Sequence, residues 1–290
     1  MSPASQPAVA IIMRSKNEMP YTEAVFDALD AQTYRNFVLY NVDSGSTDGT
    51  IELVHEKNTD RSKIIEIAPD DYVPGKVLNM MIEQAAERII VFLNADAIPQ
   101  SNQWLENLLQ PILSGEVDGT MSRQVAREDA HFIVKQDYIR AYDPIRFPGG
   151  ILEDFFSAVA CAFKKELWEE TKFYTTGYAE DLAWCRECQA KGRRFKLVAD
   201  SVVEHSHNYS LKGLYRKRYR QGVAFGYIYG TAPNGLARLY QVSKEIIRDT
   251  INAVKDLQPH TIPYNLLYRS AIHLGYHQGN REGLKRYRNK

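Results

Sequence analysis

A chain of 290 residues, 44% of them hydrophobic, is long enough to bury a sizeable core, which excludes an intrinsically disordered protein. Lysine and arginine together number 36, as do aspartate and glutamate, so no global electrostatic field attracts nucleic acid or anionic lipid. Any charged partner must therefore be met by a local group of side chains.

The early part of the chain alternates short apolar runs with amphipathic segments. This pattern is typical of strands joined by helices in a mostly parallel sheet. In chain order we predict a strand at Val9–Met13, a helix at Tyr21–Ala31, a strand at Phe37–Val42, a helix opened by Thr47–Thr50, a strand at Ile64–Ala68, a helix at Val77–Ala86 and a strand at Ile89–Leu93. Ligands bind at the carboxyl ends of strands in such sheets, so we expect Arg14–Glu18, Asp43–Ser46 and Asn94–Asp96 to converge.

From Asp118 onward the alternation loosens. The pattern predicts an extended run at Ser157–Phe163, a helix from about Glu180 that stops near Gly192, a strand at Phe195–Ala199 and helices beyond His207. We therefore expect an α/β domain over residues 1–207 and a helical C-terminal extension over residues 208–290.

Cysteine usage and hydropathy bear on location. Cys161, Cys185 and Cys188 cannot form a disulfide framework, which favours a reducing compartment and a cytoplasmic protein. Cys185 and Cys188 lie in a predicted helix with no second pair, so a structural role is favoured over redox or zinc chemistry. The run Val9–Met13 is too short to cross a membrane, and any membrane contact is expected at the surface.

The segment Asp43–Thr50 places a carboxylate at a strand end, before a glycine turn and a hydroxyl-rich helix start. An aspartate here can accept hydrogen bonds from a nucleobase edge or a ribose. A capped turn is the alternative, because serine and threonine favour helix starts.

Two further strand ends carry possible metal ligands. Asn94 and Asp96 point to the same side if the chain is extended, and their oxygens suit a hard divalent cation bridging diphosphate oxygens, although an ordinary turn before Pro99 is the alternative. His205 and His207 end another extended run, and imidazole is an acceptable manganese ligand. Their value as ligands depends on proximity to Asp96.

Adjacent carboxylates stand at a predicted helix start, Glu180 and Asp181. The positive end of the helix dipole favours an ionised carboxylate, which can act as a base toward an attacking hydroxyl. A helix cap with a first-turn acid explains the same residues.

Taken together and in this order, these segments resemble the family 2 glycosyltransferases, especially a rhamnosyltransferase-like branch. The resemblance covers approximately residues 8 to 225 and includes Arg14–Glu18, Asp43–Thr50, Pro74-Gly75 with Asn79, Asn94–Asp96, Ser122–Gln124, Phe155–Ser157, Glu180–Trp184 and His205–Ser210. It implies a GT-A fold and an enzyme of polysaccharide or glycoconjugate synthesis. Such an enzyme transfers a sugar from a nucleoside-diphosphate donor to a carbohydrate or lipid-linked acceptor in one inverting displacement. It also implies a divalent cation, Mn²⁺ or Mg²⁺, that offsets charge on the departing diphosphate.

The resemblance assigns roles to single residues. Asp181 would be the catalytic base, and Asp96 and His205 would bind the metal, with His207 as the alternative to His205. Nucleotide binding is implied for Arg14, Asn17, Glu18, Asp43, Gly75, Asn79 and Asn94. Contact with the donor sugar or acceptor is implied for Arg123, Gln124, Glu180 and Trp184, with a strand-surface position for the first two and core packing for Trp184 as alternatives.

One departure from the family pattern is visible. The usual Asp-x-Asp is Asn94-Ala95-Asp96 here, which removes one negative charge and predicts weaker metal binding. The departure keeps open a catalytically silent binding module. A sugar-phosphate nucleotidyltransferase is disfavoured because the loop Arg14–Glu18 lacks glycine, and a P-loop hydrolase because its motif is absent from the sequence.

The stretch Leu211–Arg220 interleaves cationic residues with tyrosines. On a helix, such a face is suited to the leaving diphosphate, a phospholipid surface or a lipid-linked acceptor, and a solvated surface is the alternative. Nucleic acid is disfavoured by the balanced overall charge.

Overall fold

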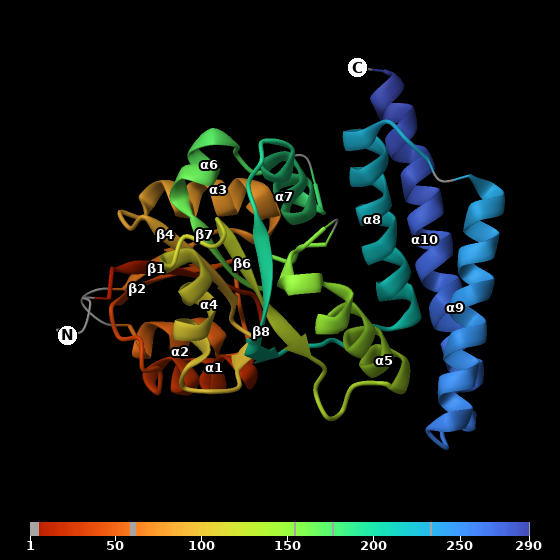
Figure 1. Ribbon diagram of the computed structural model, residues 1–290, viewed down its shortest axis with the longest axis horizontal. Coiled ribbons are helices and arrows are strands. Elements are labelled where there is room, and N and C mark those ends of the chain that lie inside the picture. The colour runs from red at the N-terminus through yellow and green to blue at the C-terminus, as the bar shows by residue number, and fades with distance from the viewer. Residues whose placement is uncertain (1–5, 59–61, 154, 176, 233, 290) are drawn as a thin grey trace. The chain divides into compact units, whose positions relative to one another are not determined.

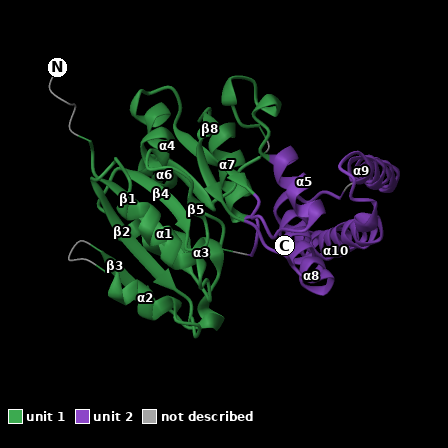
Figure 2. Ribbon diagram, turned by 90° about the horizontal axis from the view of Figure 1, so that it is seen from below, with its two compact units in different colours: residues 1–125, 142–175, 180–205 green, residues 126–141, 176–179, 206–290 purple. Residues whose placement is uncertain are grey.

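The computed structural model describes residues 6–58, 62–153, 155–175, 177–232 and 234–289. The chain divides into two compact units, coloured separately in Figure 2. Unit 1 comprises residues 1–125, 142–175 and 180–205, and unit 2 comprises residues 126–141, 176–179 and 206–290.

Unit 1 is built on one mixed β-sheet (Figure 1). Its strands are β1 Val9–Ser15, β2 Phe37–Asp43, β3 Lys63–Glu66, β4 Ile89–Asn94, β5 Ile98–Pro99, β6 Gly119–Val125, β7 Ala160–Lys164 and β8 Phe195–Glu204. Their order across the sheet is β3-β2-β1-β4-β7-β6-β8-β5. The first four are parallel, β7 runs antiparallel to both neighbours, β8 is parallel to β6, and β5 is antiparallel to β8.

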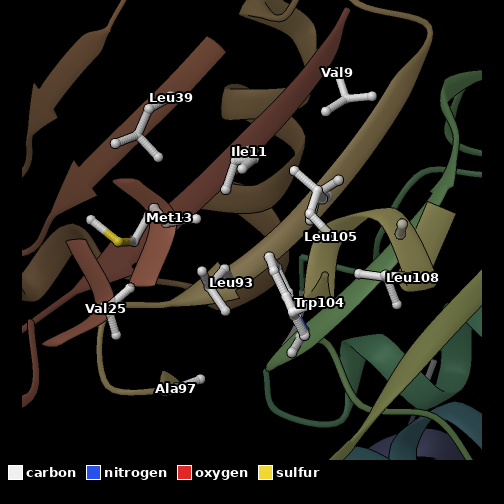
Figure 3. Packing of buried hydrophobic residues seen from close by; sticks show 14 of the residues in the cluster. Val9, Ile11, Met13, Val25, Leu39, Leu93, Ala97, Trp104, Leu105 and Leu108 are labelled. Atoms are coloured by element: carbon white, nitrogen blue, oxygen red, sulfur yellow. The ribbon is translucent and has the colours of Figure 1, made fainter. Parts of the chain in front are cut away.

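The helices of unit 1 cover the sheet. They are α1 Tyr21–Asp30, α2 Thr50–Glu56, α3 Pro74–Gln84, α4 Trp104–Leu113, α6 Lys165–Glu170 and α7 Glu180–Ala190, with 3₁₀ turns at Pro69–Asp71, Pro144–Arg146 and Pro148–Gly150. Successive side chains of a strand point to opposite faces. Val9, Ile11 and Met13 of β1 therefore share one core with α1, α2 and α4. Figure 3 shows Trp104 and Leu105 of α4 in this packing.

A cluster of aromatic rings fills a second part of the core. The ring of Trp184 lies 4.7 Å from those of Phe163 and Phe173, and Phe92 lies 5.2 Å from Phe163, each measured between ring centroids. These rings come from β4, β7, α7 and the loop before α7. The cluster therefore anchors the start of α7, which carries Glu180 and Asp181, to the centre of the sheet.

The strands predicted at Val9–Met13, Phe37–Val42, Ile89–Leu93 and Phe195–Ala199 are confirmed. Two helix starts differ from the prediction. The helix expected from Thr47 begins at Thr50, because Gly49 has a φ of 98°, a left-handed conformation outside the helix. The helix expected from Val77 begins at Pro74, where the fixed φ of proline suits the first helical position.

Two extended segments also differ from the prediction. The strand expected at Ile64–Ala68 ends at Glu66, before the 3₁₀ turn that begins at Pro69. The run expected at Ser157–Phe163 forms a strand only from Ala160, and this strand is antiparallel to β4.

Unit 2 is helical, as predicted for the chain beyond His207. Its helices are α5 Phe132–Ala141, α8 Leu211–Tyr229, α9 Gly235–Lys255 and α10 Ile262–Arg288, with a 3₁₀ turn at Pro259–Thr261. Helices α8 and α10 approach closely because glycines line their contact. A Cβ built on Gly279 would lie 2.0 Å from the carbonyl oxygen of Tyr219, and one on Gly222 would lie 2.2 Å from that of Tyr276.

All three cysteines are reduced and buried. Burial raises the pKa of the Cys188 thiol to about 12, so the protonated, unreactive form is favoured. In the described part of the chain, no helix combines the length and the apolarity that crossing a membrane requires.

Candidate active site

The loops after β1 and β2 hold each other in place around Asp43. Oδ1 of Asp43 accepts from the backbone N–H groups of Gly45 (2.9 Å) and Ser46 (2.7 Å), and Oδ2 accepts from the hydroxyls of Ser15 and Ser46, both at 2.6 Å. A carboxylate offers about four lone-pair sites, so these four bonds use all of the acceptor capacity of Asp43. Asp43 therefore fixes the turn, and a contact with a nucleobase stays a prediction.

Asn17 and Glu18 complete this pair of loops. Asn17 has a φ of 55°, a left-handed conformation that asparagine tolerates, and its amide oxygen accepts from the backbone N–H of Thr47 at 2.7 Å. The backbone N–H of Glu18 donates to the hydroxyl of Thr50 at 2.9 Å. The predicted convergence of Arg14–Glu18 with Asp43–Ser46 is confirmed.

Arg14 connects β1 to β4. Its Nη2 donates to Oδ1 of Asn94 at 2.8 Å and to the carbonyl oxygen of Ala158 at 3.0 Å. Burial alone lowers the pKa of Arg14, but its electrostatic interactions with Tyr72, Glu180 and Asp181 outweigh that effect, and the pKa is raised above its ordinary value. The guanidinium is therefore a permanent positive charge beside the end of β4.

Asp181 lies at the start of α7 and faces the same segment. Its Oδ2 accepts from the backbone N–H of Ala158 at 3.2 Å, and Oδ1 accepts from that of Leu182 at 2.8 Å. Burial raises the pKa of Asp181 above its ordinary value, although these bonds and Arg14 act in the opposite direction. The helix dipole was expected to favour the ionised form of Asp181, but desolvation by burial is the larger effect on its pKa.

Asp96 and His205 meet at the end of the sheet. Nε2 of His205 lies 3.5 Å from Oδ2 of Asp96, and both side chains are buried. Asp96 and His205 therefore each offer one possible ligand atom to a metal within unit 1. Nδ1 of His205 lies 3.0 Å from Oε1 of Gln124, so Gln124 contacts the histidine, and a contact with the sugar or acceptor stays a prediction.

The short segment from Ser157 to Val159 joins these two groups of side chains. The hydroxyl of Ser157 accepts from Nε2 of Gln124 at 3.2 Å, and the backbone of Ala158 bonds to Asp181 and Arg14. The carbonyl oxygen of Val159 accepts from the backbone N–H of Asn94 at 2.9 Å. One network in unit 1 therefore links Asp181, the expected base, to His205, one of the expected metal ligands.

Comparison with known proteins decides the family. The model of glycosyl transferase family 2 matches residues 10–171, more than half of the chain. The chain belongs to glycosyl transferase family 2. Asp181 and His205 lie beyond the matched residues, so the family match itself does not assign their roles.

Two curated relatives of this glycosyltransferase are O-antigen chain rhamnosyltransferases. RfbN of Salmonella typhimurium is 25% identical over 228 residues, which cover 74% of this chain and 71% of that protein. WbaN of Salmonella anatum is 27% identical over 210 residues, which cover 68% of this chain and 65% of that protein, slightly under two thirds of its length.

The fold is shared with solved glycosyltransferases. The mannosyltransferase PcManGT from Pyrobaculum calidifontis, solved in complex with GDP-Man and Mn²⁺, superposes with a TM-score of 0.61 at 21% identity. The match covers 93% of this chain and 75% of that one. This glycosyltransferase therefore has the α/β GT-A fold, with a mixed sheet and a long C-terminal helix.

The segment Asn94–Asp96 differs from the predicted geometry. The strand ends at Asn94, and the backbone N–H of Ala97 donates to the carbonyl oxygen of Asn94 at 3.0 Å, so residues 95 and 96 form a turn. The expectation of an extended chain here was wrong. Asn94 bonds to Arg14, whereas Asp96 lies beside His205.

Several predicted site residues have structural contacts in the glycosyltransferase. A Cβ on Gly75 would lie 1.8 Å from the carbonyl oxygen of Tyr174, so glycine allows the close approach of α3 to that loop. The side chain of Asn79 bonds to Trp168 and to the backbone of Phe173. Trp184 is completely buried, and its Nε1 donates to the carbonyl oxygen of Thr171. These contacts agree with core packing, the alternative to contact with a sugar or acceptor.

Three other regions stay without an assigned contact to substrate. Arg123 follows a β-bulge in the pairing of β6 with β8, and Glu180 is buried at the start of α7. Cationic side chains of the stretch 211–220 are exposed on α8, for example Lys212 and Arg216, and its binding role stays a prediction. A hollow of about 460 Å³ beside α4 and β8 contains none of the predicted site residues.

Proposed function

We propose that this glycosyltransferase moves a sugar from a nucleoside-diphosphate donor to an acceptor hydroxyl with inversion at the anomeric carbon. The observation that carries the proposal is the network through residues 157–159, which links Asp181 and Arg14 to Gln124 and His205. A network of this kind supports a site in which the base and the metal ligands have fixed relative positions.

Asp181 would act as the general base. In the proposed step the acceptor oxygen attacks the anomeric carbon, its proton passes to Asp181, and the bond from that carbon to the diphosphate oxygen breaks. The products are the glycoside and a nucleoside diphosphate. A carboxylate whose pKa is raised by burial is a better proton acceptor than an ordinary one, which supports this role. Arg14, beside it, would keep the carboxylate ionised in the resting enzyme.

The residues around Asp96 fit a divalent cation. The carboxylate of Asp96 and the imidazole of His205, whose facing atoms lie 3.5 Å apart, are ligands that Mn²⁺ accepts. A bound cation would neutralise charge on the departing diphosphate. Of the two histidines, His205 is favoured because it is buried and oriented by Gln124. The Mn²⁺ in the complex of PcManGT supports manganese as the first metal to test.

The names of the two curated relatives support a substrate class. Both are O-antigen chain rhamnosyltransferases, so we propose a rhamnosyl donor and a carbohydrate or lipid-linked acceptor of polysaccharide synthesis. Asp43, Asn17 and Glu18 would shape the nucleotide end of the pocket from the two interlocked loops, with Asn94 near the ribose.

The proposal is tested by donor turnover. Nucleoside diphosphates of rhamnose, mannose and glucose are incubated with the parent chain, with and without Mn²⁺, and released nucleoside diphosphate is measured. We expect one donor to turn over, and chelation of the metal to stop turnover. Asp181→Asn should abolish turnover but retain donor binding, whereas Glu169→Gln, an exposed acid on α6, should change neither. Donor binding by the parent without any release would instead indicate a silent binding module.

A further inference from the structure

Helix α9 turns an apolar face to solvent. Its exposed apolar side chains are one to seven residues apart, with exposed fractions from 47% to 78%, and are Leu236, Leu239, Tyr240, Ile247, Ile251 and Val254. This spacing places them on one side of the helix, here called the α9 apolar face. Leu257, just beyond the helix, is 85% exposed. An exposed apolar helix face of this kind indicates a site of interaction.

The polar side of α9 is the side that packs inward. Asp249, only 2% exposed, accepts from Nε of Arg269 on α10 at 2.5 Å, and Arg269 also donates to Asp137 on α5 at 2.9 Å. Glu245 pairs with Nε2 of His273 at 3.0 Å. These buried ion pairs fix the rotation of α9 about its axis, so the exposure of its apolar side follows from specific contacts.

Within α9, the charged side chains exposed beside the apolar face are positive. Lys244 and Lys255 are exposed and lie eleven residues, or about three turns, apart on one edge of this face. The two acids of α9, Glu245 and Asp249, are held in the inward ion pairs. The helix therefore presents apolar side chains flanked by lysines, the composition of helices that lie in a membrane interface.

We propose that the α9 apolar face binds an anionic lipid surface, with its leucine, isoleucine and tyrosine side chains among the upper acyl chains and Lys244 and Lys255 at the headgroups. A second copy of this chain is a poorer partner. In an antiparallel pair of facing α9 helices the lysine edges would lie together, and in either orientation no acid of the helix is left to pair with them, because both are engaged inside. The inference stands independently of the proposed sugar transfer.

The test is co-sedimentation of the full chain with vesicles. We expect binding to vesicles of phosphatidylcholine and phosphatidylglycerol in equal amounts, and much weaker binding to phosphatidylcholine alone. The combined change Leu239→Gln, Ile247→Gln and Val254→Gln should weaken binding roughly tenfold or more, because it removes three apolar side chains from the contact. The matched control, Ile139→Gln with Ile145→Gln, alters residues that are 65% and 87% exposed elsewhere and should bind like the parent.

A second variant tests the lysine edge. Lys244→Glu with Lys255→Glu should weaken binding to the anionic vesicles and should remove most of its dependence on salt. Thermal unfolding of each variant verifies that it is folded. The proposal is overturned if the parent fails to bind anionic vesicles, or if the glutamine variant binds as the parent does. A parent that is dimeric by sedimentation and becomes monomeric in the glutamine variant, with no lipid binding, would assign the face to self-association.

Discussion

Nδ1 of His205 lies 3.0 Å from Oε1 of Gln124. Because an amide oxygen only accepts, this bond implies a proton on Nδ1, and in the neutral imidazole the lone pair is then on Nε2, the atom that lies 3.5 Å from Oδ2 of Asp96. Gln124 is itself held by the hydroxyl of Ser157. The orientation of the proposed metal ligand thus depends on a residue that would not touch the metal.

We expect Gln124→Leu to weaken Mn²⁺ binding by about 10- to 100-fold, the usual effect of losing an outer partner of a histidine ligand. The measurement is calorimetric titration of Mn²⁺ in the presence of a nucleoside diphosphate. The control is Gln110→Leu, an exposed residue of α4. An unchanged Mn²⁺ affinity in Gln124→Leu would show that His205 needs no such support or does not bind the metal.

Asp181→Asn should lose transfer and gain stability at neutral pH. Burial raises the pKa of Asp181 in the folded state above its ordinary value of 3.8. As the pH rises through 3.8, the unfolded chain loses this proton first, so the folded state binds more protons and the free energy of unfolding falls. An asparagine side chain does not titrate, so the free energy of unfolding of the variant does not fall in this way. Its melting temperature should exceed that of the parent at neutral pH, and the difference should shrink as the pH approaches 3.8. A variant less stable than the parent at neutral pH would contradict the assigned direction.

Asn94→Asp tests the departure from the family's acidic motif. A carboxylate at this position would pair with Arg14, which now donates to Asn94 at 2.8 Å, and would add negative charge beside the network of Asp181. The pKa of Asp181 should rise further, because Arg14 would be shared between two carboxylates. We therefore expect the acidic limb of the pH profile of kcat/KM to move to higher pH. Asn107→Asp, outside the network, is the control, and a limb that stays in place would argue against Asp181 as the base.

The part of the sheet around β1, β2 and β4 could be predicted from the sequence, because apolar strands and the polar residues that follow them are local signals. Convergence of Arg14, Asp43 and Asn94 follows from parallel pairing alone. Two features of the site were not predictable in this way. The turn at residues 95 and 96 depends on a backbone bond from Ala97, and the link through Ala158 depends on antiparallel placement of β7 beside β4.

The roles of single residues were harder to predict than their positions. The motif residues Asn79 and Trp184 have polar or aromatic side chains suited to a ligand, yet in the structure these side chains bond to or pack against distant parts of the chain. Gln124 carried no local signal for its contact with His205, because the two residues are 81 positions apart. Long-range contacts of this kind arise from the fold and leave no periodic pattern in the sequence.

The contact between α8 and α10 offers a test of unit 2 that is independent of catalysis. A Cβ at Gly279 would lie 2.0 Å from the carbonyl oxygen of Tyr219, and backbone atoms cannot move aside as a flexible side chain can. Gly279→Ala should therefore force the helices apart and lower the free energy of unfolding by about 1–3 kcal/mol or more. Gly235→Ala, at the start of α9 with no atom within 4 Å of the added carbon, should leave the free energy of unfolding unchanged or slightly higher. Urea unfolding of both variants measures the difference, and equal stability would mean that α8 and α10 are not in this close contact in solution.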